Sequence, residues 1–157
     1  MKKLTYGIAI VALIATAFIF TQGFTPPPAG FTKKFMWTGA RTITGSTSVA
    51  VHCTNFDDAI DSTVHTEFVD FDGDSEGTDL QLVAAGETRT IVGGDDTAFY
   101  AEDSTVALGS DLNQGSVRVS VKGSKKVICS AHVLDNTSIP PLFIHDLPTF
   151  SATGAQF

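Results

Sequence analysis

Three segments of the chain alternate between apolar residues and small or polar residues at every second position. They are residues 47–53, 116–122 and 127–133, which read TSVAVHC, SVRVSVK and VICSAHV. A period of two places one face of a β-strand against a core and the other towards solvent, so each segment predicts a half-buried strand. Shorter segments with strand character fall at residues 40–44, 65–71, 80–83, 88–92 and 105–108.

Turn signals between these segments predict how the strands connect. Asp72-Gly73 and Gly93-Gly94 are pairs of this kind, and each separates two candidate strands. Seven or eight short strands at this spacing predict an all-β fold, and specifically an antiparallel β-sandwich. The segments at 116–122 and 127–133, joined through Gly123-Ser124, form the clearest predicted hairpin.

Residues 1–23 predict a secretory signal peptide that precedes the folded part. Met1-Lys2-Lys3 is a basic start, residues 4–20 are uncharged and mostly apolar, and Gly23 is a small residue before a predicted cut at Phe24. A run of this length is also at the lower limit of a membrane span, so an uncleaved anchor stays open as the alternative. The protein is expected to be exported to the periplasm, the cell surface or the medium. The short Lys-Lys start is typical of a bacterial signal.

Composition divides the remaining chain into three parts. Residues 24–35 predict a stiff leader, because three consecutive prolines favour an extended backbone. Residues 36–139 hold the predicted sandwich domain, and residues 140–157 form a tail that contains proline and phenylalanine. An apolar tail is expected either to pack on a core edge or to offer a contact surface to another chain.

The two cysteines, Cys53 and Cys129, predict a disulfide, since an exported chain meets an oxidising environment. Each lies on the apolar face of its strand. Closing so long a loop is expected to stabilise the fold by about 4 kcal/mol. The bridge would either join two sheets or link neighbouring strands of one sheet.

The charge of the chain argues against nucleic acid as a partner. The chain carries 17 acidic and 10 basic residues, and removal of residues 1–23 leaves 8 basic residues and a balance of −9. Fourteen of the acidic residues fall between Asp57 and Asp103, where Arg89 is the one basic residue. Such a field repels phosphate backbones and fits a solubilising surface or a cation-binding face.

The segment at 69–80, VDFDGDSEGTDL, holds five acidic side chains and is the candidate metal site. Its first three aspartates follow the spacing of an EF-hand loop, but Ser75 and Gln81 stand where that loop needs Gly and Glu. We therefore interpret the segment as the acidic tip of a β-hairpin. A looser calcium cage stays open as the alternative. Its candidate ligands are Asp70, Asp72, Asp74, Glu76 and Asp79.

Two histidines, His52 and His132, lie on the predicted strands that carry the cysteines, on the opposite face. If these strands are neighbours, the two histidines become diagonal partners that are close enough to share a metal ion. Two histidines alone do not complete a zinc site, so a hydrogen-bonded structural role is the alternative. No H-E-x-x-H helix or phosphate-cradling glycine loop is present, and neither catalytic residues nor a cofactor are predicted.

Three stretches, CTN at 53–55, GSVRV at 115–119 and VICSA at 127–131, resemble small secreted bacterial β-sandwich domains of unassigned function. The resemblance implies an immunoglobulin-like or fibronectin-like architecture and supplies no catalytic residues.

The leading functional hypothesis is an exported, disulfide-stapled β-sandwich with a structural, adhesive or protein-binding role and no catalysis. Its partner would be another protein or a cell-surface component. The alternative is an extracellular binding domain that calcium stabilises through residues 70–79, and an exported enzyme of unknown class is the third hypothesis.

Overall fold

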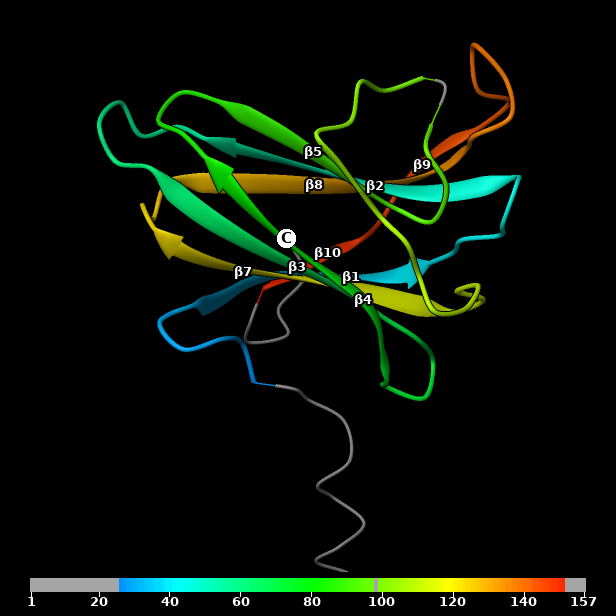
Figure 1. Ribbon diagram of the computed structural model, residues 1–157, viewed down its shortest axis with the longest axis horizontal. Coiled ribbons are helices and arrows are strands. Elements are labelled where there is room, and N and C mark those ends of the chain that lie inside the picture. Colours follow the sequence, from blue (N-terminus) through cyan, green and yellow to red (C-terminus); the bar gives the residue numbers. More distant parts are fainter. Residues whose placement is uncertain (1–25, 98, 152–157) are drawn as a thin grey trace, which may run out of the picture.

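Two five-stranded sheets pack face to face in the computed structural model, which describes residues 26–97 and 99–151 (Figure 1). Sheet A has the order β10 (Thr149–Ser151), β1 (Thr32–Ala40), β7 (Gly115–Gly123), β3 (Ser62–Val69), β4 (Ser75–Val83). Sheet B has the order β6 (Ser104–Val106), β5 (Thr88–Gly93), β2 (Thr47–Asn55), β8 (Val127–Asp135), β9 (Ile144–Asp146). The described residues contain no helix, so the predicted all-β sandwich is confirmed at this level. The predicted antiparallel arrangement is wrong for one pair, because β6 lies parallel to β5 and makes sheet B mixed. The predicted signal peptide at 1–23 lies outside the described residues.

Alternation along the strands builds the core between the sheets. The inward side chains of β2, β7 and β8 are those of the predicted apolar faces, and most are valines. Trp37 and Phe68, the largest side chains in this core, are fully buried. Trp37 also donates a hydrogen bond from Nε1 to Thr149 Oγ1 at 2.9 Å, which satisfies its polar atom.

The hairpin predicted from 116–122 and 127–133 is wrong. β7 pairs with β1 and β3 in sheet A, whereas β8 pairs with β2 and β9 in sheet B, so the short link between them crosses from one layer to the other (Figure 1). Gly123 allows the crossing, because it adopts φ +109° and a Cβ there would meet the Asp61 carbonyl oxygen at 2.4 Å. Alternation reports which face of a strand is buried and carries no information about which sheet holds the strand.

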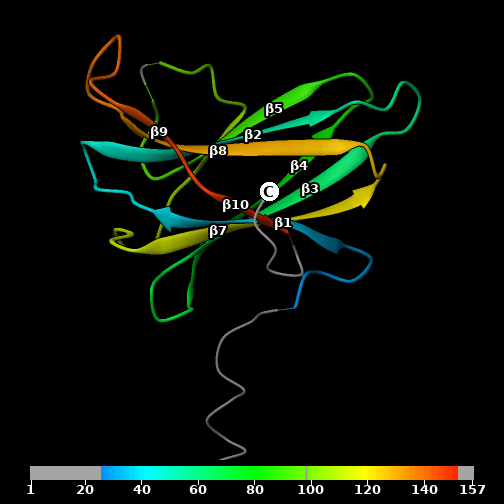
Figure 2. The same cartoon turned by 180° about the vertical axis from the view of Figure 1, so that it is seen from behind.

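The sandwich uses more of the chain than residues 36–139. β1 begins at Thr32, inside the predicted leader, while most of the segment predicted as a strand at 40–44 lies outside the named strands. In the tail, β9 extends sheet B and β10 extends sheet A, and the buried Leu147 lies between them. Figure 2 shows the tail passing from β9 to β10 across the open side of the sandwich. The tail therefore packs on the domain edge, which was one of its two predicted roles.

No helix within residues 26–97 and 99–151 is long and apolar enough to cross a membrane.

Candidate functional site

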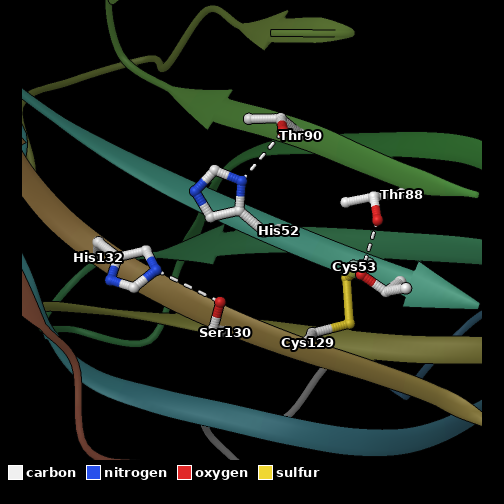
Figure 3. The surroundings of a disulfide bond; sticks show 8 residues. His52, Cys53, Thr88, Thr90, Cys129, Ser130 and His132 are labelled. Atoms are coloured by element: carbon white, nitrogen blue, oxygen red, sulfur yellow. Dashed lines mark hydrogen bonds between the residues drawn. A yellow bond between two sulfur atoms is a disulfide. The ribbon is translucent and has the colours of Figure 1, made fainter. Parts of the chain in front are cut away.

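The disulfide joins neighbouring strands within sheet B (Figure 3). Cys53 in β2 and Cys129 in β8 are direct register partners, with their Cα atoms 4.1 Å apart. Of the two arrangements that the sequence left open, the structure has the one inside a single sheet. A bond at this position fixes the register of β2 against β8, because a slip of even one residue would separate the two sulfur atoms.

His52 and His132 lie on the opposite face of the same two strands, as predicted. Their ring centroids are 5.3 Å apart. The register pairs His52 with Ser130 and Ala50 with His132, so the histidines are diagonal neighbours. Among the described residues, no group of three or more histidine, cysteine, aspartate or glutamate side chains is arranged to hold a metal ion.

Each ring nitrogen of His132 contacts a different polar side chain. Nδ1 lies 2.7 Å from Asp146 Oδ1, and Nε2 lies 3.3 Å from Ser130 Oγ. Asp146 is the register partner of His132 in the β8–β9 pair, and Ser130 precedes His132 by two residues on the same face. Figure 3 shows the Ser130 hydroxyl beside the His132 ring. Strand pairing therefore places all three side chains together.

The second histidine, His52, occupies a drier position in the same cluster. Its Nδ1 lies 3.0 Å from Thr90 Oγ1, and its ring meets Tyr100 edge to face with the centroids 4.6 Å apart. Burial, together with the nearby His132, lowers the pKa of His52 to about 4. Burial and the Asp146 carboxylate raise the pKa of Tyr100. At neutral pH His52 is therefore an uncharged ring beside a protonated phenol.

Sequence reasoning found His52 and His132 but missed Ser130, Asp146, Thr90 and Tyr100. Asp146 comes from the tail, where no strand was predicted. Ser130 did carry a signal, because the alternation of β8 puts it on the same face as His132.

The candidate calcium ligands lie along one hairpin, and no three of them form a group that could hold a metal ion among the described residues. Asp70 Oδ1 accepts hydrogen bonds from the backbone N–H groups of Gly73 and Asp74, each at 2.8 Å, and Asp72 is exposed in the turn. Asp79 lies four residues into β4, pairs with Thr66 and accepts a hydrogen bond from Gln81 Nε2 at 2.9 Å. β3 and β4 form the predicted hairpin on either side of this turn. The Asp70 carboxylate thus closes the turn itself, and Asp79 lies apart from it.

A further motif lies in the same hairpin. Residues 73–77 read GDSEG and match the G-x-S-x-G pattern of hydrolase nucleophiles. That pattern needs a sharp turn from a strand into a helix, whereas Ser75 is the exposed first residue of β4. Ser75 is therefore no nucleophile elbow.

A buried aspartate organises the loop between β8 and β9. The Asp135 carboxylate, 4% exposed, accepts hydrogen bonds from Thr137 N at 3.0 Å, Thr137 Oγ1 at 2.6 Å and Leu142 N at 3.0 Å, and another from Ser138 Oγ. These bonds, that from the Leu142 amide first, hold the pKa of Asp135 far below its usual range. One carboxylate thus ties together both ends of the loop at 136–143.

An apolar cavity of about 330 Å³ lies beside this loop. Its lining residues are Gly39, Arg41, Thr47, Val133, Phe143, His145 and Leu147. The rings of Phe143 and His145, which both line the cavity, stack with their centroids 5.6 Å apart.

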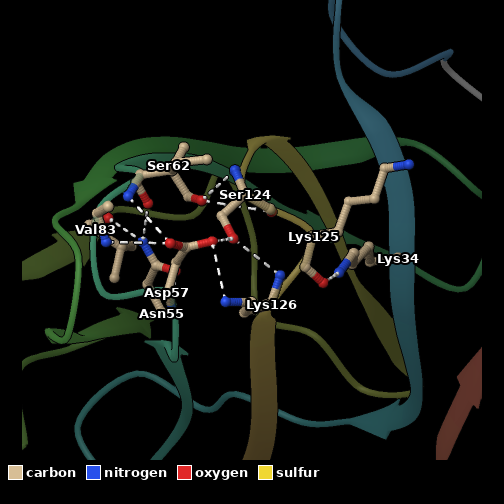
Figure 4. Close-up of polar contacts among 10 residues, drawn as sticks. Lys34, Asn55, Asp57, Ser62, Val83, Ser124, Lys125 and Lys126 are labelled. Carbon is tan, nitrogen blue, oxygen red and sulfur yellow. Dashed lines mark hydrogen bonds and ion pairs between the residues drawn. The ribbon is translucent and has the colours of Figure 1, made fainter.

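A separate polar network locks the β7–β8 crossing (Figure 4). Asp57 Oδ2 accepts a hydrogen bond from Ser124 Oγ at 2.8 Å, and Ser62 Oγ accepts one from Ser124 N at 2.9 Å. The Ser124 contact is the main cause of a lowered pKa at Asp57. Lys34 Nζ donates to the Lys125 carbonyl oxygen. These contacts tie the β2–β3 loop and strands β1 and β3 to the β7–β8 crossing, so we interpret the network as structural.

Comparison of the chain with protein-family models, curated proteins and solved structures gives no match. Assignment of function therefore depends on the geometry of this molecule.

Proposed function

We propose that the protein is an exported, disulfide-stapled β-sandwich that binds another protein or cell-surface component through the loop at 136–143 and the start of β9. The observation that carries this proposal is the contrast between the loop's anchor and its surface. Asp135 is buried and fully engaged, whereas Ile139 is 72% and Leu142 84% exposed. The exposed Phe143 and Ile144 continue the apolar surface.

The energetics favour binding by such a loop. Burial of one Ile or Leu side chain against a partner contributes about 1.5–3 kcal/mol. A loop that is already tied to its own carboxylate loses little conformational freedom when it binds, so more of this energy appears as affinity. Large exposed apolar side chains gathered at one place mark interaction surfaces in proteins of this size.

The proposed architecture is a rearranged immunoglobulin-like sandwich. With the short β6 set aside, the second strand pairs with the fifth (β2 with β5) and the third with the sixth (β3 with β7), as in immunoglobulin domains. The first and last strands have exchanged places, since β1 lies beside β7 and β8 beside β2. Because the exchange places β8 beside β2, the disulfide forms within one sheet. In antibody domains the disulfide joins the two sheets.

Photocrosslinking on cells of the source organism tests the binding proposal. A photoreactive amino acid at Leu142 is expected to capture a defined partner, and Ile139→Asp in the same protein is expected to abolish the adduct. The matched control places the photoreactive group at Leu80, which is 57% exposed on sheet A. Equal adducts from both positions, or a Leu142 adduct unaffected by Ile139→Asp, would contradict the proposal.

A further inference from the structure

His132 lies between a hydroxyl and a carboxylate, with one of them on each ring nitrogen. An ionised carboxylate only accepts hydrogen bonds, so Asp146 Oδ1 at 2.7 Å places the ring proton on Nδ1. Nε2 then keeps its lone pair and faces Ser130 Oγ at 3.3 Å. This is the polarity that a histidine needs to act as a general base towards a serine hydroxyl.

Strand register holds these groups in place. His132 and Asp146 are direct partners across β8 and β9, and His52 and Ser130 are direct partners across β2 and β8. Side chains that project from paired strands keep their spacing better than side chains on loops. The disulfide at the adjacent register position fixes the β2–β8 pair. Ser130 itself is exposed, so its hydroxyl is open to an incoming substrate.

We propose that Ser130 is the nucleophile of a hydrolytic site for short acyl esters, with His132 as its general base and Asp146 as the residue that positions His132. This site lies on the outer face of sheet B and does not rest on the proposed protein-binding function.

The reaction balances with water as the only co-reactant. Ser130 Oγ attacks the ester carbonyl carbon while its proton passes to His132 Nε2. The bond from that carbon to the alcohol oxygen breaks, and His132 returns the proton to the departing alcohol. Water then attacks the acyl-serine and gives a proton to His132. The bond from the acyl carbon to Ser130 Oγ breaks, His132 returns the proton to Ser130 Oγ, and the acid is released.

His52 and the open sheet face form the surroundings of Ser130. His52 is uncharged at neutral pH and stands directly across from Ser130. Its Nδ1 lies 3.0 Å from Thr90 Oγ1, a contact that holds the ring in place beside Ser130. An open sheet face fits a short acyl group, because a long chain would need a buried channel. The net charge of −7 favours neutral or cationic esters.

The test combines active-site labelling with ester hydrolysis by the purified protein. A fluorophosphonate probe is expected to add once, at Ser130, and p-nitrophenyl acetate is expected to be hydrolysed with saturation. Ser130→Ala should abolish labelling and lower kcat about a hundredfold or more. Ser75→Ala, which changes the exposed serine of the GDSEG motif, is the matched control and should leave both unchanged.

Asp146→Asn separates positioning from simple structural support. It should lower kcat with little change in KM, because the His132 ring loses the acceptor that keeps its proton on Nδ1, and Asp146→Glu should restore part of the rate. Circular dichroism and thermal melting measurements establish that each variant is folded. Absence of probe addition and turnover in the wild-type protein would overturn the proposal. A Ser130→Ala protein that labels and turns over like wild type would also overturn it.

Discussion

Two clusters of polar side chains in this protein are assembled in different ways. The acidic turn at 70–74 draws on one short segment, and the Asp70 carboxylate is satisfied by the backbone N–H groups of that same turn. The cluster around His132 draws on β2, β8, β9 and the segment that contains Tyr100. The first cluster is complete without the rest of the fold, and the second exists only when three strands pair in register.

The difference shows where polar side chains remain available to a ligand or substrate. A turn that closes on its own carboxylate leaves few oxygens directed at a ligand. Strand pairing, by contrast, can hold a base beside a hydroxyl at a distance of 3.3 Å in an exposed position, because backbone bonds and core packing stabilise the arrangement. Changes that disturb strand register should therefore affect the His132 cluster and spare the acidic turn.

Removal of the disulfide should have the largest effect. The double variant Cys53→Ala/Cys129→Ala is expected to lose about 4 kcal/mol of unfolding free energy, since the unfolded chain is no longer restrained by a link across 76 residues. Urea denaturation measures the loss, with the reduced wild-type protein as the control. NMR spectra should show shifts at His52 and His132 with little change at Asp70. Unchanged stability would contradict the assigned role of the bridge.

Substitution of Asp135 comes next in size. Asp135→Asn removes acceptor capacity from the loop that presents Leu142 and should lower the melting temperature at pH 7 by several degrees. The folded-state pKa of Asp135 lies below its unfolded value, so its contribution is complete above about pH 4 and is lost as the pH falls further. The wild-type protein should therefore lose stability in acid more steeply than Asp135→Asn. Equal falls in the melting temperatures of the two proteins as the pH is lowered would refute this expectation.

Protonation of His52 should have a smaller effect, at milder pH. Its folded pKa of about 4 lies below the ordinary 6.5, so the stability that neutral His52 contributes is present above pH 6.5 and declines as the pH falls towards 4. We expect a loss of about 1–2 kcal/mol over this range, reduced by the partial exposure of the ring. NMR titration of the ring should give a midpoint near 4. His52→Gln should flatten the loss, with His65→Gln on sheet A as the control.

Addition of calcium is expected to leave the stability of the protein unchanged. The Asp70 carboxylate already closes its turn and Asp79 lies apart, so calcium at millimolar concentration should leave the melting temperature unchanged relative to chelator. A saturable rise that Asp74→Asn abolishes would instead establish the calcium-stabilised alternative.

The sequence was a good guide to strands and a poor guide to their partners. Alternation identified β2, β7 and β8 and the valine-bearing face that each strand buries. It did so because the side chains of a strand point to the core at every second residue. The same pattern wrongly joined β7 to β8, since a hairpin and a crossing between sheets bury the same residues. The crossing depends on Gly123 and on Ser124 contacts with distant loops, which local patterns do not reveal.

Prediction of the cluster around His132 was incomplete for a related reason. His52 and His132 were paired correctly because each lies on a cysteine-bearing strand, and the assumed bridge made those strands neighbours. Asp146 was missed because β9 is a short strand whose residues are all exposed, so it has no apolar periodicity. Its position follows from pairing with β8, which is a long-range property of the fold.

The central claim is that β2 and β8 pair in the register that sets Cys53 against Cys129 and His52 against Ser130. Close Hα–Hα approach is typical of antiparallel pairs with short Cα separations, such as the 4.1 Å found for Cys53 and Cys129. A nuclear Overhauser experiment on the oxidised protein tests the register directly. We predict strong Hα–Hα contacts for Cys53 with Cys129 and for Val51 with Ala131. Contacts displaced by one or more residues, or strong contacts between β7 and β8, would contradict the account.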